Sequence, residues 1–311
     1  MHIYITKIYK GEYNQSMIKR FILLICVLIL QVNLFSKGKV DKNMEKKPFS
    51  SLKTYELVFC DDFDGTNLDL SKWEPCPEWE RQGHMKNHGW WADECVSVKD
   101  GNLVLECKKA ADGRLISGAV RTLSKDYTKQ LFMQNKGMWE MKFKVDKADG
   151  LWYAFWMMAN NNDKVIGKGA VDGAELDFFE ILPGKSWWKK NGIEGNFAGR
   201  MMTTFHWDGY GPAHQMKGTD GISVDDFDPD FYDKWHVYKF IWCEEGYECY
   251  LDDKLLWILD GAEYGGTVNA AGYTKISAEF GDWGGPVDKD IAAGGSKFMY
   301  VDYVKIYKEK K

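Results

Sequence analysis

Short runs of alternating apolar and polar residues, separated by turn-forming residues, constrain the fold of this chain more than any other feature. The segment Trp139–Val145 has the sequence W-E-M-K-F-K-V, which in a strand places charge on one face only. Similar runs, rich in aromatic and β-branched residues, cover Asn102–Cys107, Val237–Trp242, Glu248–Leu251 and Met299–Tyr307. No long stretch shows a helical period with caps. The sequence therefore predicts an all-β fold, a sandwich of two antiparallel sheets of the jelly-roll kind.

The composition supports a folded domain and excludes two other classes of protein. Hydrophobic residues make up 45% and aromatic residues 15% of the 311 residues, which excludes a disordered chain. The net charge is −5, whereas a general nucleic-acid binder is usually basic, so we expect no nucleic-acid partner. A single β sandwich can fill this length, and no internal repeat is visible, so we expect one main domain. The sequence leaves the oligomeric state open, with a monomer as the default.

The N-terminal segment predicts export. The apolar run Phe21–Leu30 follows the basic pair Lys19-Arg20 and is too short to span a bilayer. We interpret residues 1–36 as a signal peptide, with Met17 as the expected true start, although a buried N-terminal strand is the alternative. Residues 37–50 form a polar tail or linker and 51–311 the main domain. The protein is then secreted, periplasmic or held at the cell surface, with no membrane span in the mature chain.

Six cysteines remain after removal of this segment. An exported compartment permits disulfides. Cys243 and Cys249 flank a predicted Glu245-Gly246 hairpin turn, so they either pair across two strands or remain free buried thiols. No spacing typical of a zinc site occurs.

The most informative stretch is Ala174–Leu182, A-E-L-D-F-F-E-I-L. In a regular strand Glu175 and Asp177 share one face, but Glu180 falls on the apolar face, where an unpaired carboxylate is costly. One extra residue restores the alternation, so we predict a β-bulge near Phe178-Phe179 and three carboxylates on one face. Such a row is either a solvated acidic face or the pair of carboxyls that retaining glycosidases use. In the second case Asp177 would keep the pKa values of the two glutamates apart.

The stretch Glu175–Glu180 resembles the bulged E-x-D-x-x-E motif of glycoside hydrolase family 16, which includes laminarinases, mixed-linkage glucanases, agarases and carrageenases. Further segments resemble this family in the same order along about residues 55–307. They are Ile116–Thr122, Gly137–Lys142, Gly150–Met157, Thr204–Trp207, Trp235–Tyr238 and Val301–Val304.

The resemblance implies a concanavalin-like β-jelly roll with a substrate cleft across its concave sheet. It implies Glu175 as nucleophile, Glu180 as general acid/base and Asp177 as their supporting residue. The reaction would be a double displacement through a covalent glycosyl-enzyme intermediate, with no cofactor required.

Aromatic residues are the candidates for binding sugar, because a pyranose ring has an apolar C–H surface. The resemblance places Trp152 in the cleft, and Trp156, four residues later, lies either there or in the core. His206 would contact the substrate or the catalytic carboxyls, or be structural. Trp90 and Trp91 would form an exposed pair in a loop that extends a subsite, or anchor the core.

The strand near the end departs from the pattern of many laminarinases. Its stretch Ile276–Gly285 lacks their Asn, and Glu279 takes a nearby place, although Trp283 remains as a candidate stacking residue. This departure weakens the assignment to β-1,3-glucan and leaves glycoside cleavage intact.

Many family members hold a structural Ca²⁺. By resemblance Asp302 is one candidate ligand, with the Gly101 carbonyl and Asp62 as companions, since a hard cation prefers oxygen ligands. The alternative is that Asp302 caps a turn.

These features predict an exported, endo-acting retaining glycosidase whose best-fitting substrate is a β-1,3- or mixed-linkage β-1,3-1,4-glucan. A galactan such as agar, porphyran, carrageenan or a keratan-type glycan is the alternative substrate. A carbohydrate-binding jelly roll without activity is the alternative of another class. The sequence favours the enzyme, because all three carboxylates are present.

Overall fold

The computed structural model describes residues 47–81, 89–159, 174–190, 193–264 and 266–310. The predicted signal peptide and residues 37–46 of the predicted tail lie outside these ranges. A compact unit spans Pro48–Lys311. Its first residues contact the rest of the unit, because Ser50 donates hydrogen bonds from its backbone N–H (2.8 Å) and its hydroxyl (2.5 Å) to the buried carboxylate of Glu248. The predicted tail therefore overlaps this unit at residues 48–50.

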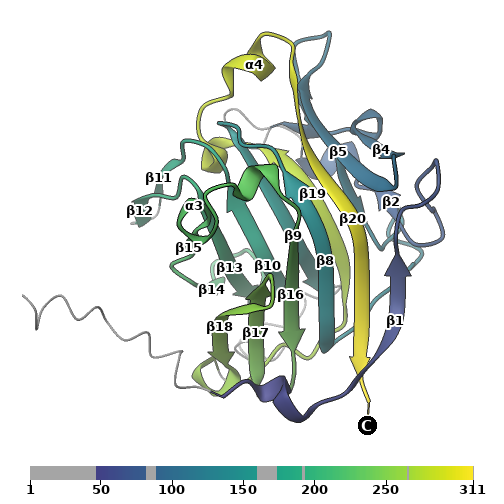
Figure 1. Cartoon of the computed structure of the whole chain (residues 1–311), viewed down its shortest axis with the longest axis vertical. Coiled ribbons are helices and arrows are strands. Elements are labelled where there is room, and N and C mark those ends of the chain that lie inside the picture. Colours follow the sequence, from purple (N-terminus) through teal and green to yellow (C-terminus); the bar gives the residue numbers. More distant parts are fainter. Residues whose placement is uncertain (1–46, 82–88, 160–173, 191–192, 265, 311) are drawn as a thin grey trace, which may run out of the picture. The chain divides into compact units, whose positions relative to one another are not determined.

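Two large β-sheets form the unit, as the alternating runs predict (Figure 1). The first sheet has the order β18 (Lys254–Asp260), β17 (Gly246–Leu251), β16 (His236–Trp242), β8 (Gly137–Val145), β20 (Ser296–Glu309), β5 (Asn102–Lys109), β6 (Leu115–Ser117) and β3 (Trp90–Trp91), with β1 (Tyr55–Asp61) on β20 and β4 (Val96–Lys99) on β5. All of its pairs are antiparallel except β3 with β6.

The second sheet is antiparallel and contains the carboxylate strand. Its order is β14 (Gln215–Gly218), β13 (Arg200–Trp207), β10 (Ala174–Leu182), β9 (Leu151–Ala159), β19 (Gly272–Phe280), β7 (Ala119–Arg121) and β2 (Glu74–Pro75), with β15 (Ile222–Ser223) on β13. A hairpin of β11 (Trp187–Lys190) and β12 (Ile193–Asn196) is separate. Strand β10 therefore has a neighbour on both sides.

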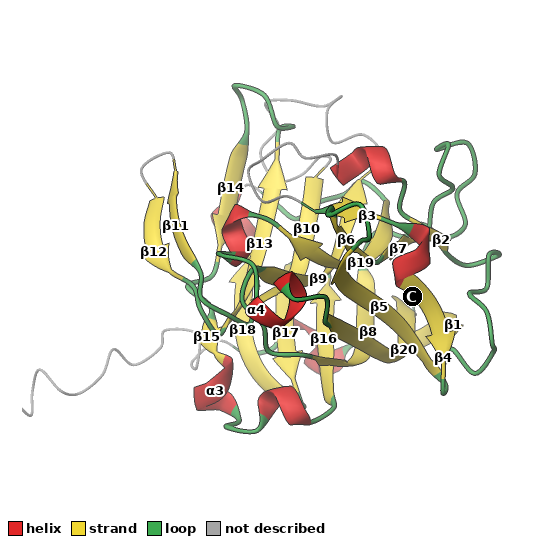
Figure 2. Cartoon of the chain, turned by 90° about the horizontal axis from the view of Figure 1, so that it is seen from above, coloured by secondary structure: helices red, strands yellow, loops and turns green. Residues whose placement is uncertain are grey.

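The described helices are single turns of three or four residues at the ends of strands (Figure 2). They are η2 (Phe49–Leu52), η3 (Glu78–Arg81), η4 (Asp93–Cys95), α3 (Val224–Phe227), η6 (Phe231–Asp233), η7 (Gly261–Tyr264), η8 (Asp282–Gly284) and α4 (Lys289–Ala292). None of the helices among the described residues is long and apolar enough to cross a membrane.

Aromatic side chains from both sheets fill the space between them. Phe178 of β10 stacks on Phe240 of β16, with ring centroids 4.4 Å apart, and meets Phe155 of β9 edge-on at 5.0 Å. Rings that face each other across two sheets bury large apolar areas and contribute further through their edge and face contacts. This core fixes β9 and β10, so their other faces are held in place for the site.

The six cysteines in the described residues are all free. Cys249 lies opposite Phe240 in the β16–β17 pair, whereas Cys243 lies in the turn and bonds the Gly246 carbonyl. The alternative of a cross-strand disulfide is therefore wrong, and both residues are buried thiols.

Candidate active site

The bulge predicted in β10 is present and sets the direction of its carboxylates. From Asp177 to Phe179, β10 advances by two residues. Its neighbour β9 advances by only one over the same step, from Trp156 to Phe155. Phe178 and Phe179 are both buried in the core as a result. Glu175, Asp177 and Glu180 then lie opposite Met158, Trp156 and Ala154, alternate residues of β9. Since directly opposed residues share a face, the three carboxylates lie on the side of the sheet away from the core.

The surroundings of Asp177 and Glu180 favour the protonated forms of these two side chains. Asp177 has a relative exposure of 4%, and burial, followed by the charge of Glu175, raises its pKa well above the ordinary value. Burial also raises the pKa of Glu180 well above the ordinary value; the charge of Asp177 adds to the rise, while His206 opposes it. Removal from water and like charges both disfavour ionisation. Asp177 and Glu180 therefore release their protons at a higher pH than exposed carboxyls do.

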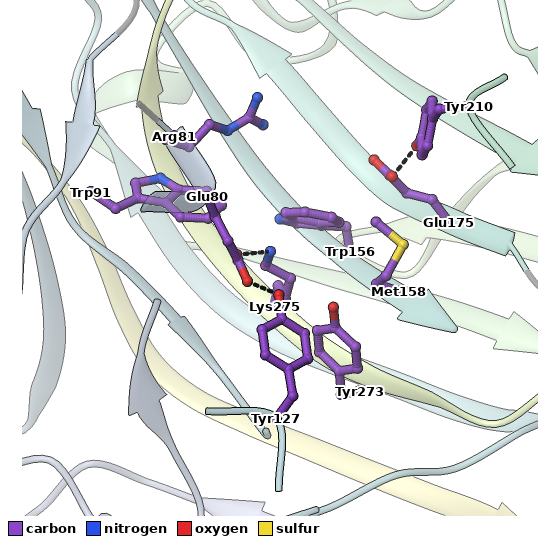
Figure 3. A pocket seen from close by; sticks show the side chains of 10 residues that line it. All are labelled: Glu80, Arg81, Trp91, Tyr127, Trp156, Met158, Glu175, Tyr210, Tyr273 and Lys275. Atoms are coloured by element: carbon purple, nitrogen blue, oxygen red, sulfur yellow. Dashed lines mark hydrogen bonds and ion pairs between the residues drawn. The ribbon is translucent and has the colours of Figure 1, made fainter. Parts of the chain in front are cut away.

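A group of three side chains covers one end of the carboxylate row. His206 of β13 lies opposite Glu175, and its Nε2 is 3.4 Å from a carboxylate oxygen of Asp177. Its Nδ1 is 2.9 Å from Nε2 of His214, whose ring stacks on it. Tyr210 donates a hydrogen bond from its hydroxyl to Glu175 (Figure 3). His206 therefore contacts a catalytic candidate, as one of its two sequence interpretations proposed.

The sequence analysis did not identify Tyr210 and His214. Both lie in the loop between β13 and β14, where Asp208 and Gly209 have φ of +61° and +67°. Two consecutive residues with positive φ form the tight turn that an Asp-Gly pair favours. The Asp208-Gly209 pair that follows β13 could have predicted this turn, which brings the next residues over the carboxylates.

A cleft with a volume of about 360 Å³ opens beside Glu175 (Figure 3). Its lining combines carboxylate, cationic and aromatic side chains from the second sheet and from the segments at its rim. The lining residues are Glu80, Arg81, Trp91, Tyr127, Trp156, Met158, Glu175, Tyr210, Tyr273 and Lys275. Concave sites of this size with aromatic walls and a few polar groups are typical of ligand binding.

A buried ion cluster lies across the cleft from Glu175. Lys275 of β19 donates to Glu80 at 3.0 Å, and Arg121 also pairs with Glu80. Burial alone would raise the pKa of Glu80, but the charges of Lys275 and Arg121 outweigh it and hold this pKa below its ordinary value. The Lys275 ammonium lies 4.1 Å from the centroid of the Trp156 ring. These contacts fix the ring of Trp156 in the cleft wall.

Glu279, which lies near the position of the Asn in the laminarinase pattern, belongs to a second network of polar contacts. It pairs with Arg81 and accepts a hydrogen bond of 2.6 Å from Ser277, whose hydroxyl accepts one of 3.0 Å from the Trp156 indole. Burial raises the pKa of Glu279, although Arg81 and Ser277 oppose the rise. The Arg81 guanidinium also lies 5.4 Å from the centroid of Trp152. The departure from the laminarinase pattern therefore comes with its own charge partner.

Of the five tryptophans predicted to bind sugar, two line the cleft and three do not. Trp91 and Trp156 line the cleft, and Trp152 packs beside them on the same face. Trp283 packs against this cluster and stacks on Phe197, with centroids 5.8 Å apart, but is not among the lining residues. Trp90 packs under Arg114 at 5.2 Å. The prediction of an exposed Trp90–Trp91 pair is wrong, because successive residues of a strand point to opposite faces and Trp91 is buried.

Both candidate calcium carboxylates lie near lysines. Asp302 forms an ion pair of 2.6 Å with Lys142, and Asp62 lies 3.8 Å from Lys305. Gly101, with φ of +74°, lies in the turn between β4 and β5. No group of three or more His, Cys, Asp or Glu able to hold a metal occurs in the part of the chain that the structure describes. Calcium binding at Asp302, Asp62 and the Gly101 carbonyl therefore stays a prediction, and we assign calcium no role in the chemistry.

Comparison with known proteins places this arrangement in context. The sequence profile described as glycosyl hydrolases family 16 matches residues 84–303. The chain is 26% identical over 278 residues to glucan endo-1,3-beta-glucosidase A1 of Niallia circulans, covering 82% of this chain and 38% of that protein. It is 27% identical over 207 residues to glucan endo-1,3-beta-glucosidase of Cryptopygus antarcticus, covering 63% of this chain and 66% of that one. The chain thus spans less than half of the first relative's length.

A solved structure shares the fold. It is the catalytic domain of an endo-1,3-beta-glucanase (laminarinase) from Thermotoga petrophila RKU-1, with a TM-score of 0.63 and 24% identity. The match covers 84% of this chain and all of that one. The jelly-roll sandwich expected from the sequence is therefore confirmed.

Proposed function

The chain belongs to glycosyl hydrolase family 16, and on that premise we propose that it is an endo-acting, retaining hydrolase of a β-1,3- or mixed-linkage β-1,3-1,4-glucan. The observation that carries this proposal is the row of Glu175, Asp177 and Glu180 on one face of a bulged strand beside an aromatic cleft. The names of the relatives from Niallia circulans and Cryptopygus antarcticus support the substrate class.

In the first step Glu175 acts as the nucleophile. One of its oxygens attacks the anomeric carbon, and the bond from that carbon to the glycosidic oxygen breaks. Glu180 gives its proton to the departing oxygen, and a glycosyl ester of Glu175 remains. The raised pKa of Glu180 supports this role, since a general acid must hold its proton at working pH.

In the second step a water molecule attacks the same carbon from the side that the leaving group vacated. Glu180, now a carboxylate, takes the water proton, and the ester bond to Glu175 breaks. Two inversions give net retention at the anomeric carbon. Both carboxyls return to their starting protonation.

Asp177 and Tyr210 prepare Glu175 for this reaction. Asp177 lies nearly buried between the two glutamates, and burial, followed by the charge of Glu175, raises its pKa. The Tyr210 hydroxyl donates to Glu175 and orients it before substrate binds. The sugar ring would lie against the cleft wall that Trp156 forms.

Product analysis tests the proposal. The protein is incubated with laminarin, barley β-glucan, agarose, porphyran, κ-carrageenan and keratan-type glycans, and the products are separated by chromatography. Oligosaccharides from the glucans alone are expected. Products from a galactan alone would retain the carboxylate chemistry and contradict the substrate class.

The variant Glu175→Gln separates catalysis from binding alone. It keeps the shape of the side chain and removes the nucleophile, so kcat on the cleaved glucan is expected to fall by about 10³-fold or more. Glu56→Gln, an exposed change on β1, is the matched control and retains full activity. Hydrolysis that survives Glu175→Gln would contradict the mechanism. Binding of a glucan without hydrolysis by the wild type would favour the binding-only alternative.

Export is part of the proposal as well. The basic and apolar segment before residue 37 supports it. N-terminal sequencing of the protein recovered outside the cytoplasm is expected to begin near residue 37, and recovery of the uncut chain in the cytoplasm alone would contradict it.

A further inference from the structure

Two exposed aromatic residues, Trp79 and Tyr127, lie together at the rim of the cleft. Their relative exposures are 53% and 41%, and their ring centroids are 5.7 Å apart. Trp79 comes from η3 and Tyr127 from the turn that follows β7. We call these two residues the rim pair. Exposed aromatic rings that lie together, unlike single ones, are typical of a binding surface.

The backbone at Tyr127 adopts a strained conformation that its neighbours hold in place. Its φ is +62°, a left-handed conformation that costs free energy for a bulky residue. Asp126 stabilises the turn by accepting hydrogen bonds from Ser124 (2.6 Å) and from the backbone and hydroxyl of Thr128 (3.0 and 2.8 Å). The turn thus presents an aromatic side chain where glycine or asparagine would be less strained.

The ring of Tyr127 is also fixed. The Arg121 guanidinium lies 4.3 Å from its centroid, and its hydroxyl donates to Glu80 in the cleft. A ring held on one face and at its hydroxyl loses little freedom when a ligand binds, so more of the contact energy appears as affinity. This arrangement is preorganised for a partner.

The rim pair continues the cleft away from the carboxylates. Tyr127 is itself a lining residue, together with Tyr273 and Lys275 of β19 (Figure 3). Between the strand of Glu175 and this end of the cleft, the sheet order is β10, β9, β19, β7. Two to three strand spacings correspond to about 10–14 Å. A polysaccharide that crosses the strands from Glu175 would reach the rim pair with a sugar that does not react.

We propose that Trp79 and Tyr127 form a distal sugar-binding subsite, which stacks on the C–H face of a pyranose unit in the same glucan chain whose bond is cleaved at Glu175. The inference rests on the proposed function and names which part of the substrate is bound away from the reaction. A long chain gains contact at both places, whereas a short substrate reaches only the carboxylates.

The test compares two lengths of substrate in one variant. Trp79→Ala and the wild type are assayed on laminarin and barley β-glucan and on 2,4-dinitrophenyl laminaribioside, which is too short to reach the rim pair. On the polymer that the wild type cleaves, kcat/KM is expected to fall about five- to tenfold, mainly through KM. On the short glycoside it stays within about twofold, because its contacts are unchanged.

Trp235→Ala is the matched control. Trp235 is an exposed tryptophan (39%), and the Lys142 ammonium of the first sheet lies 5.5 Å from its ring centroid. The Trp235→Ala variant should keep the wild-type kcat/KM on both substrates. Trp79→Phe retains an aromatic face and should restore most of the polymer activity.

An unchanged kcat/KM of Trp79→Ala on the polymer, or an equal loss on polymer and short glycoside, would overturn the subsite. Absence of any wild-type activity on both glucans would overturn the proposed function instead. The wild-type rate on the polymers therefore tells the two failures apart.

Discussion

Asp177 is the side chain whose surroundings conflict most with a charge. It has little exposure and lies beside Glu175 and Glu180, and its pKa is raised by burial first and by Glu175 second. An acid whose pKa is higher in the folded state binds its proton more tightly there. Its contribution to stability is therefore present at low pH and is lost as pH rises toward the folded pKa. Keeping this carboxylate for catalysis therefore lowers the stability of the fold at higher pH.

Replacing Asp177 with Asn should raise stability and lower activity. The variant has no ionisable group, so its advantage in melting temperature over the wild type is expected to grow as pH rises above about 4. Each kcal/mol recovered corresponds to about 2–4 °C in a domain of this size. Calorimetry from pH 4 to 8 measures it, with exposed Asp64→Asn as the control. A melting temperature lower than that of the wild type at neutral pH would contradict the account of Asp177.

Glu180 should determine the alkaline side of the pH profile. Its pKa lies well above 4.5, so the acid form persists past that pH and kcat/KM is expected to fall as pH rises through the raised pKa. In Glu180→Ala this alkaline limb should disappear for 2,4-dinitrophenyl glycosides, whose leaving group needs no proton, and azide should restore turnover. Rates measured between pH 4 and 9 test this. A limb that remains in Glu180→Ala belongs to another group.

At the scale of elements, the bulge in β10 depends on two hydroxyls from other strands. The extra residue leaves the Phe178 carbonyl outside the ladder, and it accepts hydrogen bonds from Thr203 (2.8 Å) and Tyr238 (2.5 Å). A buried carbonyl without a partner costs about 1–3 kcal/mol. These two residues therefore hold Glu180 on the cleft face, although neither contacts the cleft.

Removing both hydroxyls should affect stability and activity together. The double variant Thr203→Val/Tyr238→Phe is expected to lose about 1–3 kcal/mol in denaturant unfolding, and kcat should fall because Glu180 shifts. Tyr153→Phe removes a comparable hydrogen bond, to the Asp146 carbonyl at 3.1 Å, away from the bulge. This control should lose stability with kcat unchanged. An unchanged kcat in the double variant would show that the bulge does not need these donors.

Local patterns predicted the strands and the bulge but not the side chains that complete the site. In a regular strand the apolar alternation would bury the Glu180 carboxylate, and a bulge avoids this. The prediction could therefore be made from the nine residues of this strand. The contact between Tyr210 and Glu175 depends on the path of a loop 35 residues later. The partner of Glu279 is likewise Arg81, nearly 200 residues away, and no local pattern contains it. Long-range charge pairs are set by the packing of whole elements.

At the scale of the molecule, residues 48–53, which precede β1, are part of the folded unit. The Glu248 carboxylate is fully buried and accepts hydrogen bonds from the Ser50 backbone and hydroxyl and from Tyr250. Ser50 thus supplies two of these three hydrogen bonds. Buried carboxylates are stable only when such donors are retained.

Two truncations test this boundary. A chain that begins at residue 47 should match the full chain in melting temperature and kcat/KM. A chain that begins at residue 54 should lose about 1–3 kcal/mol, because Glu248 loses the Ser50 donors. Ser50→Ala within the longer chain removes only the hydroxyl and should have an intermediate effect. Equal stability of the two truncations would contradict a structural role for η2.

The cleft takes its floor from central strands and its rim from short segments at strand ends: η3, the turn after β7 and the loop before β14. In evolutionary terms, the catalytic residues of the central strands and the substrate-binding residues of the rim can change independently. Loops tolerate insertion and substitution far better than core strands do. New specificities within this scaffold can arise by exchange of η3 and the turn after β7 while the bulged strand and the Tyr210 loop are inherited intact, and a directed-evolution library confined to those two segments would sample substrates without losing the chemistry.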